Sequence, residues 1–256
     1  MKTYGLIGYP LSHSFSQQYF TRKFEEEKTD ARYLLFPIPV ITDFPELLDH
    51  HPYIAGLNVT IPYKEKVIPY LNALDDSVKE IGAVNVIKIF WNGNQPFLKG
   101  YNSDVYGFEQ SLIPMLEPHH QRGLILGTGG ASKAVAYVLN KLNIPFTFVS
   151  RTPKQLNEIN YSEVTKEVIQ SHPIIINTSP IGMFPYSDNC PDIPYEYLSN
   201  HHLVYDLIYN PEQTLFLQNA EERGAKIKNG IEMLFLQARR AWEIWNTDDS
   251  TTAAVD

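Results

Sequence analysis

A glycine-rich turn between an apolar run and a helical repeat constrains the fold of this chain more than any other feature. Residues 124–126 are all apolar and suit a buried parallel strand, and apolar residues then recur at helical spacing through residues 131–142. Asn143 and Pro145 end that helix, and residues 146–150 form a second strand. A strand, a helix and a strand of this size form a βαβ unit, so the chain is predicted to be an α/β protein.

The turn itself indicates a dinucleotide site. Gly127 permits a tight turn, Gly129 lets the backbone approach a pyrophosphate, and the amides that open the helix face its negative charge. A glycine-rich connection without a ligand is the alternative, and the complete βαβ context favours the nucleotide. Ser132 stands where Gly or Ala is commoner. The expected cofactor contacts in the turn are Gly127, Thr128, Gly129, Gly130 and Ala131.

The end of the second strand indicates which dinucleotide binds. An NAD site places a carboxylate there for the ribose 2′-hydroxyl, but this chain has a basic segment and no acid before Glu158. Arg151 and Lys154 are suited to pair with a 2′-phosphate, and Ser150 and Thr152 to donate hydroxyls. NADP(H) is therefore favoured, with a solvated basic turn as the alternative.

Composition and charge argue against several classes of protein. The 256 residues include 21 Lys and Arg against 29 Asp and Glu, and the net charge of -8 offers nucleic acid or an anionic membrane no general attraction. One cysteine, Cys190, excludes an intrachain disulfide framework. No apolar run has membrane-spanning length, and the start of the chain lacks a signal peptide's apolar stretch. We expect a cytoplasmic protein that binds neither nucleic acid nor membranes.

Metal binding is not expected either. The eight histidines include three adjacent pairs, but no His-x-x-x-His spacing and no cysteine cluster accompanies them.

The first half of the chain predicts a sheet with mixed strand directions. Strands are expected at residues 3–9, 33–40 and 55–61, with helices after residue 16 and at 44–50 and 75–81. Residues 83–90 and 97–101 flank a turn at 91–94 and form a hairpin. Pro62 is expected to start a further helix, which would place Lys64 in its first turn. The helix dipole disfavours a cation there, which would lower the pKa of the lysine and make it more useful for proton transfer.

Polar residues at two helix starts allow both a structural and a functional interpretation. Ser16 is suited to cap the first helix, but with Ser14 it forms a pair of hydroxyls that is suited to bind a carboxylate. Asp104 begins a connecting helix at residues 105–116, where an isolated acid is by default a capping or first-turn residue.

The second half continues with strands at residues 174–178 and 203–209. The loops that follow them are expected on the ligand side, because ligands of open α/β sheets bind outside the carboxyl ends of strands. A last helix, residues 230–245, is expected to pack on the first domain. Its apolar stripe comprises Ile231, Leu234, Phe235, Ala238, Ala241, Trp242 and Trp245. Gln237 is displaced from this stripe and would reach the ligand or, more commonly, face water.

Eight segments of the chain together resemble the shikimate dehydrogenase family, and the resemblance covers almost the whole sequence. They are residues 14–16, 56–64, 82–85, 100–104 with 107–108, 127–132, 177–183, 206–211 and 229–237. The resemblance implies reversible NADPH-dependent reduction of 3-dehydroshikimate to shikimate, in aromatic amino acid biosynthesis, by a monomer or homodimer.

The resemblance also implies roles for single residues. Lys64 and Asp104 match the catalytic pair, and a lysine suits the chemistry because hydride transfer to a carbonyl carbon leaves an alkoxide that needs a proton donor. The implied substrate-binding residues are Ser14, Ser16, Asn58, Thr60, Asn85, Asp104, Tyr209 and Gln237. Further implied cofactor contacts are Thr178, Met183, Leu207 and Gly230.

The sequence departs from the family pattern at a few positions. Ser103 stands for a usual Thr, Thr128 for a frequent Ala and Ser150 for a common Asn. Lys154 stands where Arg is frequent, and it offers a point charge rather than a fork, which weakens selectivity for a 2′-phosphate. The alternatives are a quinate/shikimate dehydrogenase that uses NAD and a non-catalytic regulator that binds NADP or shikimate.

The expected organisation is two domains. Residues 1–102 form a substrate-binding catalytic domain with a mixed sheet, completed by a C-terminal helix at residues 230–246. Residues 103–229 form a Rossmann-like NADP-binding domain, and residues 247–256 a disordered tail.

Overall fold

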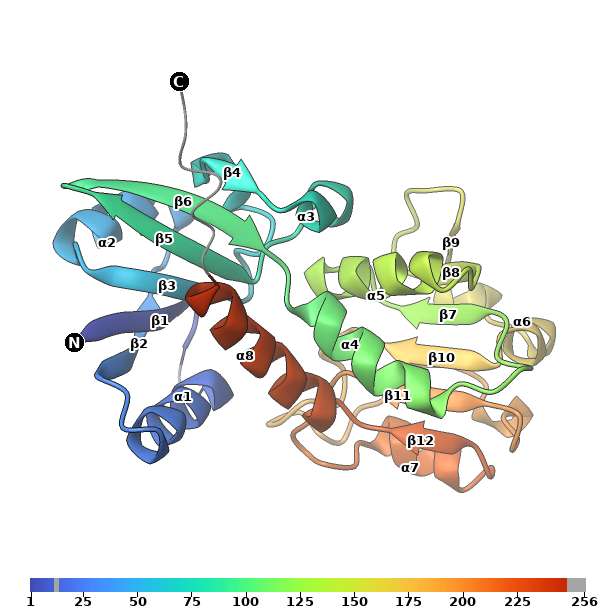
Figure 1. The fold of residues 1–256 in the computed structure, drawn as a ribbon. Helices are drawn as coiled ribbons and strands as arrows, with labels where there is room; N and C mark the ends of the chain where they lie inside the picture. Colours follow the sequence, from blue (N-terminus) through green and yellow to red (C-terminus); the bar gives the residue numbers. More distant parts are fainter. Residues whose placement is uncertain (12–13, 248–256) are drawn as a thin grey trace. The chain divides into compact units, whose positions relative to one another are not determined.

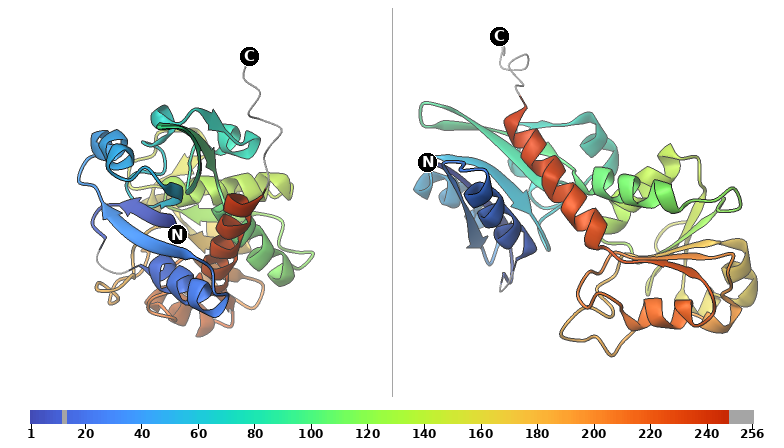
Figure 2. Two further views of the ribbon diagram at one scale, coloured as in Figure 1. Left: turned by 60° about the vertical axis from the view of Figure 1, so that its left-hand side comes forward. Right: turned by 60° about the horizontal axis from the view of Figure 1, so that its bottom comes forward.

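The computed structural model describes residues 1–11 and 14–247, which form two compact units (Figure 1; Figure 2). The first unit comprises Met1–Ser103 and the chain from Ala238 onward, and the second comprises Asp104–Gln237. Most of the tail predicted to be disordered, residues 248–256, lies outside the described residues. No helix within the described ranges is both long and apolar enough to cross a membrane.

A six-stranded mixed sheet forms the centre of the first unit, in the order β2-β1-β3-β5-β6-β4. The strands are β1 (Lys2–Gly8), β2 (Ala31–Pro37), β3 (Ile54–Val59), β4 (Ala73–Leu74), β5 (Val86–Asn92) and β6 (Gln95–Tyr101). Strand β1 runs parallel to β2 and β3, whereas β5 runs antiparallel to β3 and forms a hairpin with β6. The predicted mixed sheet is confirmed. The carboxyl ends of β1, β3 and β6 and the start of β5 therefore meet at one edge.

Two apolar cores flank this sheet. Helices α1 (Phe15–Glu26), α2 (Phe44–His50) and α3 (Asp76–Ile81) accompany short 3-10 turns η1 (Ile41–Asp43) and η2 (Ile68–Tyr70). Phe20 of α1 packs in one core with Tyr4 and Trp245. Trp245 lies directly against Gly56, where an added Cβ would be 2.3 Å from its Nε1, and its indole donates to the Ile87 carbonyl at 3.0 Å. Gly56 thus permits a close approach that a larger residue would block.

The helix predicted from Pro62 is wrong. Residues 62–67 form successive turns, and only η2 follows them. In an α-helix the Lys64 carbonyl would accept from Ile68, but here it accepts from the Val84 amide at 2.7 Å. The buried Tyr63 side chain donates its hydroxyl to the Ile38 carbonyl at 2.6 Å. These tertiary contacts replace the helix, so the helix-dipole argument for Lys64 fails.

A six-stranded parallel sheet forms the second unit, in the order β12-β11-β10-β7-β8-β9. The strands are β7 (Gly123–Leu126), β8 (Phe146–Val149), β9 (Glu158–Ile159), β10 (Ile174–Asn177), β11 (Leu203–Asp206) and β12 (Lys226–Lys228). The helices are α4 (Asp104–Leu112), α5 (Gly130–Lys141), α6 (Lys166–Ser171) and α7 (Leu215–Glu221), with 3-10 turns η3 (Ile113–Met115), η4 (Tyr161–Glu163) and η5 (Tyr195–Tyr197). The predicted βαβ unit is confirmed as β7-α5-β8.

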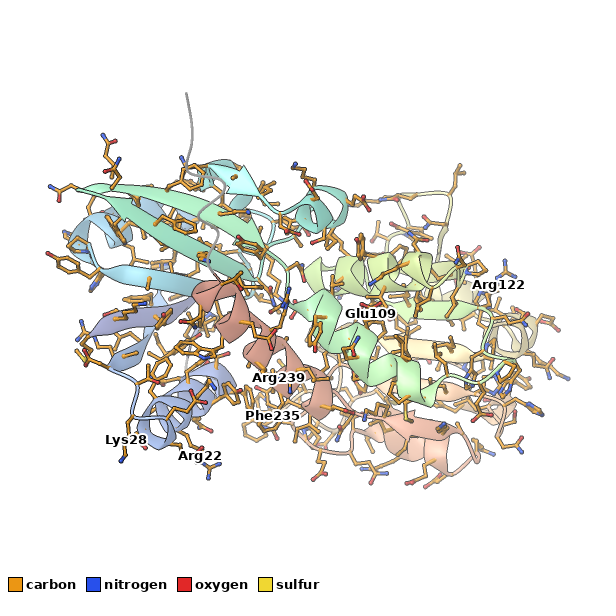
Figure 3. All side chains as sticks on the ribbon, viewed as in Figure 1. Arg22, Lys28, Glu109, Arg122, Phe235 and Arg239 are labelled. Carbon is orange, nitrogen blue, oxygen red and sulfur yellow. The ribbon has the colours of Figure 1, made fainter. Side chains whose placement is uncertain are left out.

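Helix α8 (Ile231–Asn246) buries the predicted stripe at Ala238, Ala241 and Trp245, but its first half buries a different face. Ile231 and Phe235, the latter labelled in Figure 3, are 40% and 47% exposed, whereas Met233 and Gln237 are buried. The expectation that Gln237 faces water is therefore wrong. Its side-chain amide donates to the Leu234 carbonyl at 2.9 Å.

The division between the units falls inside α8, between residues 237 and 238, rather than before residue 230. The first half packs on α4, where a Cβ on Gly107 would lie 2.6 Å from the Met233 carbonyl. The second half packs on the first unit through Ala238, Ala241 and Trp245. The other boundary between the units lies between residues 103 and 104, one residue later in the chain than predicted. Thr247, assigned to the predicted tail, donates its amide to the Glu243 carbonyl at 2.8 Å and so continues the helix end.

Asp206, the last residue of β11, is fully buried and organises the loop that follows. Its Oδ1 accepts from the Asn177 side chain at 3.0 Å and from the Ile208 amide at 3.1 Å. Its Oδ2 accepts from the Thr214 hydroxyl at 2.6 Å, and Thr214 caps α7 through the Leu217 amide. Burial raises the pKa of Asp206 to about 6 although these hydrogen bonds oppose the shift. The carboxyl ends of β10 and β11 are thereby tied to the start of α7.

Replacing this buried acid should change the pH dependence of stability. Since the pKa of Asp206 rises from 3.8 to about 6 on folding, the folded state binds more protons between these values. The contribution is complete below pH 3.8 and is lost as the pH rises through about 6. In urea unfolding, the stability difference between wild type and Asp206→Asn should shift in favour of wild type by ~1 kcal/mol from pH 7 to pH 5. The exposed Asp188→Asn control should show no such change, and a constant difference for Asp206→Asn would contradict the shift.

Candidate functional site

The turn after β7 has the geometry of a phosphate-binding turn. Gly127 has a φ of +111°, in the region that favours glycine, and its amide donates to the Val149 carbonyl at 2.9 Å. Gly129 is the N-cap of α5, and a Cβ added there would meet no atom within 4 Å. Open space therefore faces the N-terminus of a 12-residue helix, where backbone amides and the helix dipole favour an anion.

Thr178 closes one side of this turn. It follows β10, and its hydroxyl donates to the Leu126 carbonyl at 2.9 Å. A Cβ on Gly127 would lie 2.9 Å from the same hydroxyl oxygen, so the glycine also makes room for Thr178. The predicted contacts Thr128, Gly130 and Ala131 complete the connection from β7 into α5.

The basic segment follows β8, the neighbour of β7 in the sheet, and so emerges at the same edge. Arg151, Thr152 and Lys154 are exposed. The Ser150 hydroxyl accepts from the Thr152 amide at 3.2 Å, which shapes the turn. Glu158, the first acid after the segment, accepts from the Lys154 backbone amide at 2.7 Å. The cationic side chains thus follow the second strand of the βαβ unit, as the prediction of a 2′-phosphate contact requires.

The loops after β10 and β11 are joined to each other. The Phe184 amide donates to the Asn210 carbonyl at 3.1 Å, which links the loop carrying Met183 to the loop carrying Tyr209. These two side chains are 43% and 38% exposed, and burial of the rest of the ring raises the pKa of Tyr209. An apolar and a phenolic side chain are therefore presented from adjacent loops of the second unit.

Leu207 and Gly230 fix the backbone beside these loops. The Leu207 amide donates to the Asn177 carbonyl at 3.0 Å, and the Gly230 amide donates to the Ile208 carbonyl at 3.0 Å. A Cβ on Gly230 would lie 2.0 Å from the Leu207 carbonyl oxygen, so only glycine fits this approach.

Predicted substrate-binding residues of the first unit lie at the edge where β1, β3, β5 and β6 begin or end. Ser14 caps α1, because its hydroxyl accepts from the Gln17 amide at 3.3 Å. The cap predicted for Ser16 is therefore wrong. Ser16 lies in the first turn of α1, and its side chain lowers the pKa of Tyr33 against the larger, opposite effect of burial. Ser14 reaches the cap position because the chain turns into α1 at Phe15.

A buried polar network continues from there along the edge. Tyr33 donates its hydroxyl to Asn58 Oδ1 at 2.7 Å, and Asn58 Nδ2 donates to the Asn85 carbonyl at 3.3 Å. The Asn85 side chain accepts from the Ser103 amide at 2.7 Å and donates to the Ser103 hydroxyl at 3.0 Å. The structure thus brings Asn58 and Asn85 together in one network. Tyr33 and Ser103 were not predicted, because a hydroxyl within a strand or loop carries no sequence signal for its partner.

Thr60 and Lys64 follow β3 at the same edge. The Thr60 amide donates to the Ile7 carbonyl at 3.0 Å, and its methyl lies where a Cβ on Gly8 would clash. Lys64 is half-buried, and its backbone is held by Val84. The remaining predicted residues, Asp104, Tyr209 and Gln237, belong to the second unit, and Asp104 is a buried residue that opens α4.

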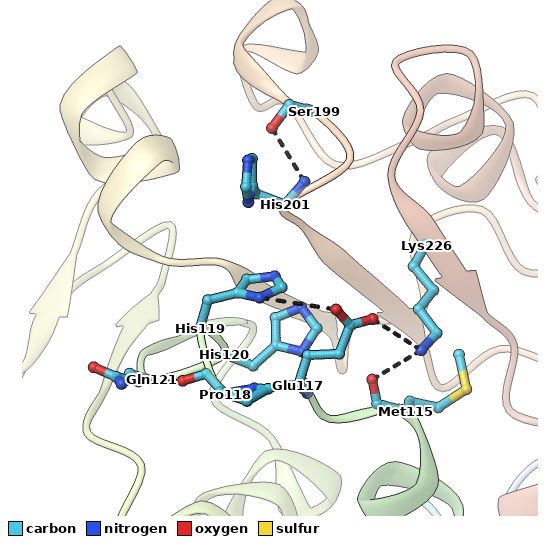
Figure 4. A network of polar contacts seen from close by, with 9 residues as sticks. All are labelled: Met115, Glu117, Pro118, His119, His120, Gln121, Ser199, His201 and Lys226. Carbon is cyan, nitrogen blue, oxygen red and sulfur yellow. Dashed lines mark hydrogen bonds and ion pairs between the residues drawn. The ribbon is translucent and has the colours of Figure 1, made fainter.

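Histidines gather at the opposite, amino-terminal edge of the parallel sheet (Figure 4). The His119 ring centroid lies 4.3 Å from that of His120 and 5.4 Å from that of His201. His120 accepts the Glu117 amide on Nδ1 at 2.9 Å, and burial lowers its pKa. Glu117 also pairs with Lys226 at 3.4 Å. Among the residues with described positions, no group of three His, Cys, Asp or Glu side chains is arranged to hold a metal ion.

The chain is similar to known shikimate dehydrogenases over nearly its whole length. The family model for the shikimate dehydrogenase substrate binding domain matches residues 6–87. A shikimate dehydrogenase (NADP(+)) of Caldanaerobacter subterraneus subsp. tengcongensis is 36% identical, with 95% of this chain and 91% of that protein covered.

Solved structures give the same result. The shikimate dehydrogenase of Aquifex aeolicus matches with a TM-score of 0.84 and 33% identity, covering 96% of this chain and 92% of that chain. That of Thermus thermophilus in complex with NADP(H) and shikimate matches with a TM-score of 0.82 and 25% identity, covering 96% and 94%.

A methyl group at the open end of α5 should report on the anion site. Gly129→Ala meets no protein atom, so its thermal midpoint should stay within a few degrees of wild type, whereas dinucleotide affinity should fall roughly tenfold or more as the methyl occupies phosphate space. Fluorescence titration with the oxidised dinucleotide measures this. Gly93→Ala, in the hairpin turn of the first unit, makes the same chemical change and should bind normally. Unaltered affinity in Gly129→Ala would place the phosphates elsewhere.

Proposed function

The chain belongs to the shikimate dehydrogenase family, and on this premise we propose that it catalyses the reversible NADPH-dependent reduction of 3-dehydroshikimate to shikimate. One observation carries the proposal. The chain combines a glycine turn and a basic segment in one unit with a polar strand edge and a lysine in the other, and it matches the family along its length. In this role the protein serves aromatic amino acid biosynthesis.

The residues of the second unit fit NADP(H). Gly127 to Ala131 receive the pyrophosphate at the start of α5, and Arg151 and Lys154 receive the 2′-phosphate with the hydroxyls of Ser150 and Thr152. Thr178, Met183, Leu207 and Gly230 line the nicotinamide end from the loops after β10 and β11 and from the start of α8. When bound, the reduced cofactor supplies the hydride that reaches the carbonyl carbon.

The residues of the first unit hold the substrate. Ser14 and Ser16 bind its carboxylate with Thr60, because hydroxyl donors at a helix start suit an anion. Asn58 and Asn85 offer amide groups to the ring hydroxyls from the network at the strand edge. Asp104 and Gln237 also bind ring hydroxyls, and Tyr209 contributes to the carboxylate site.

Lys64 supplies the proton. As the carbonyl carbon gains hydride, its oxygen becomes an alkoxide, and the Lys64 ammonium protonates it; in the reverse direction the neutral amine takes the proton back. Asp104 orients the ammonium and holds its charge. The pairing of these two residues is part of the proposal.

We further propose a substrate-binding unit and an NADP-binding unit divided as the structure divides them, at residues 103/104 and 237/238. The protein acts in the cytoplasm as a monomer or homodimer, with small-molecule ligands and neither nucleic acid nor membrane as partner. The net charge of -8 agrees with this, since anionic ligands are then held only by local groups.

The proposed activity should appear as reduced-nicotinamide absorbance when purified protein is mixed with shikimate and NADP. Turnover with shikimate and NADP should exceed that with quinate or NAD, because the basic segment offers charge to the 2′-phosphate and the two serines match the shikimate-binding pattern. A clear preference for quinate with NAD would favour the quinate enzyme. Binding of both ligands without turnover would favour a non-catalytic regulator.

Removal of the proposed proton donor should abolish most of the activity. Lys64→Ala should lower kcat by about 10²- to 10⁴-fold with little effect on NADP binding, because general acid catalysis contributes that much. Steady-state kinetics and a cofactor titration measure the two effects. Lys66→Ala removes an exposed lysine from the same turns and should keep near wild-type turnover. Equal activity of the two variants would remove Lys64 from the mechanism.

A further inference from the structure

Tyr33 of β2 is buried, yet its ring packing does not require a hydroxyl. The ring stacks on Phe20 with centroids 4.9 Å apart and an interplanar angle of 12°. Phenylalanine would make the same contact. A buried hydroxyl is unfavourable unless it is hydrogen-bonded, so the partners of Tyr33 indicate why it is there.

The Tyr33 hydroxyl binds a side chain that the proposed function assigns to substrate. It donates to Asn58 Oδ1 at 2.7 Å. Burial holds the pKa of Tyr33 far above its usual range, so the hydroxyl keeps its proton at every physiological pH. The donor toward Asn58 is therefore permanent.

This donor and the Asn85 carbonyl together fix which way the Asn58 amide faces. Because Oδ1 accepts from Tyr33, Nδ2 must point the other way, where it donates to the Asn85 carbonyl at 3.3 Å. Without the hydroxyl, only the Asn85 carbonyl would favour this orientation of the amide.

We propose that Tyr33 is a positioning residue for the substrate, which presets the Asn58 amide before shikimate binds. This inference rests on the proposed function. A preset site loses less side-chain freedom on binding, so the effect falls on substrate affinity and not on the cofactor or on proton transfer.

The test is Tyr33→Phe, which keeps the ring and removes the hydroxyl. The KM for shikimate should rise about tenfold, equivalent to ~1.4 kcal/mol, while the KM for NADP stays within twofold of wild type and kcat falls less than KM rises. A merely structural role would not separate the two KM values. If wild type oxidises shikimate but Tyr33→Phe leaves the KM for shikimate unchanged, the inference is overturned and the proposed function is not. A wild type that does not oxidise shikimate would instead overturn the proposed function.

Tyr205→Phe is the matched control. Tyr205 is also fully buried, and its hydroxyl shares a hydrogen bond of 2.8 Å with Ser111 in the second unit. Loss of the Tyr205 hydroxyl should lower the thermal midpoint, as loss of the Tyr33 hydroxyl should, but it should leave the KM for shikimate unchanged. A rise in KM equal to that of Tyr33→Phe would mean that loss of any buried hydroxyl has this effect, and would overturn the inference.

A double-variant cycle tests the route of the effect. In an Asn58→Ala background, Tyr33→Phe should raise the KM for shikimate by a smaller factor than in wild type. An undiminished factor would overturn the inference. If Tyr33→Phe does not fold, NMR of wild type labelled with 15N-asparagine replaces it. The Asn58 side-chain amide should give one sharp pair of signals before shikimate is added, and exchange broadening that shikimate removes would overturn the inference.

Discussion

The antiparallel pairing of β5 with β3 is the constraint on which the substrate side of this protein depends. In a purely parallel sheet, the start of a strand lies at the edge opposite to the ends of its neighbours. Here β5 is reversed, so Asn85, directly before it, lies at the edge where β3 ends, and Asn58 pairs with Val86. Residues that precede one strand and follow others therefore converge. The polar network from Tyr33 to Ser103 is a consequence of that reversal.

The second unit achieves a similar convergence by a different route. All its strands run in one direction, so the loops after β7, β8, β10 and β11 emerge together. Glycines then permit close approaches: Gly127 faces the Thr178 hydroxyl, and Gly230 faces the Leu207 backbone. In the proposed function an overall negative chain holds an anionic cofactor here, through local amides and through Arg151 and Lys154 rather than through net charge.

Buried polar groups set the precision of both edges, and each is balanced by specific partners. Burial raises the pKa of Asp206, and the three hydrogen bonds of its carboxylate fix the loop that carries Leu207 and Tyr209. Tyr33 is buried as a neutral donor and orients Asn58. An apolar replacement at either position would fill the space, but the neighbouring polar groups would lose the hydrogen bonds that orient them. These groups are therefore better understood as orienting elements than as sources of stability.

Sequence alone determined the features that depend on neighbours along the chain. Hydrophobic periodicity and glycines predicted β7-α5-β8, the β5–β6 hairpin and the phosphate turn, because each is decided within about 30 residues. Motif resemblance supplied the site residues. Tertiary structure decided the rest. The Lys64 carbonyl accepts from the Val84 amide instead of from the next turn of the predicted helix. Helix α8 buries Met233 and Gln237 because Gly107 leaves room for them. The partners of Tyr33 and Asp206 also lie at distant positions, and a local pattern carries no information about which distant group will satisfy a buried hydrogen bond.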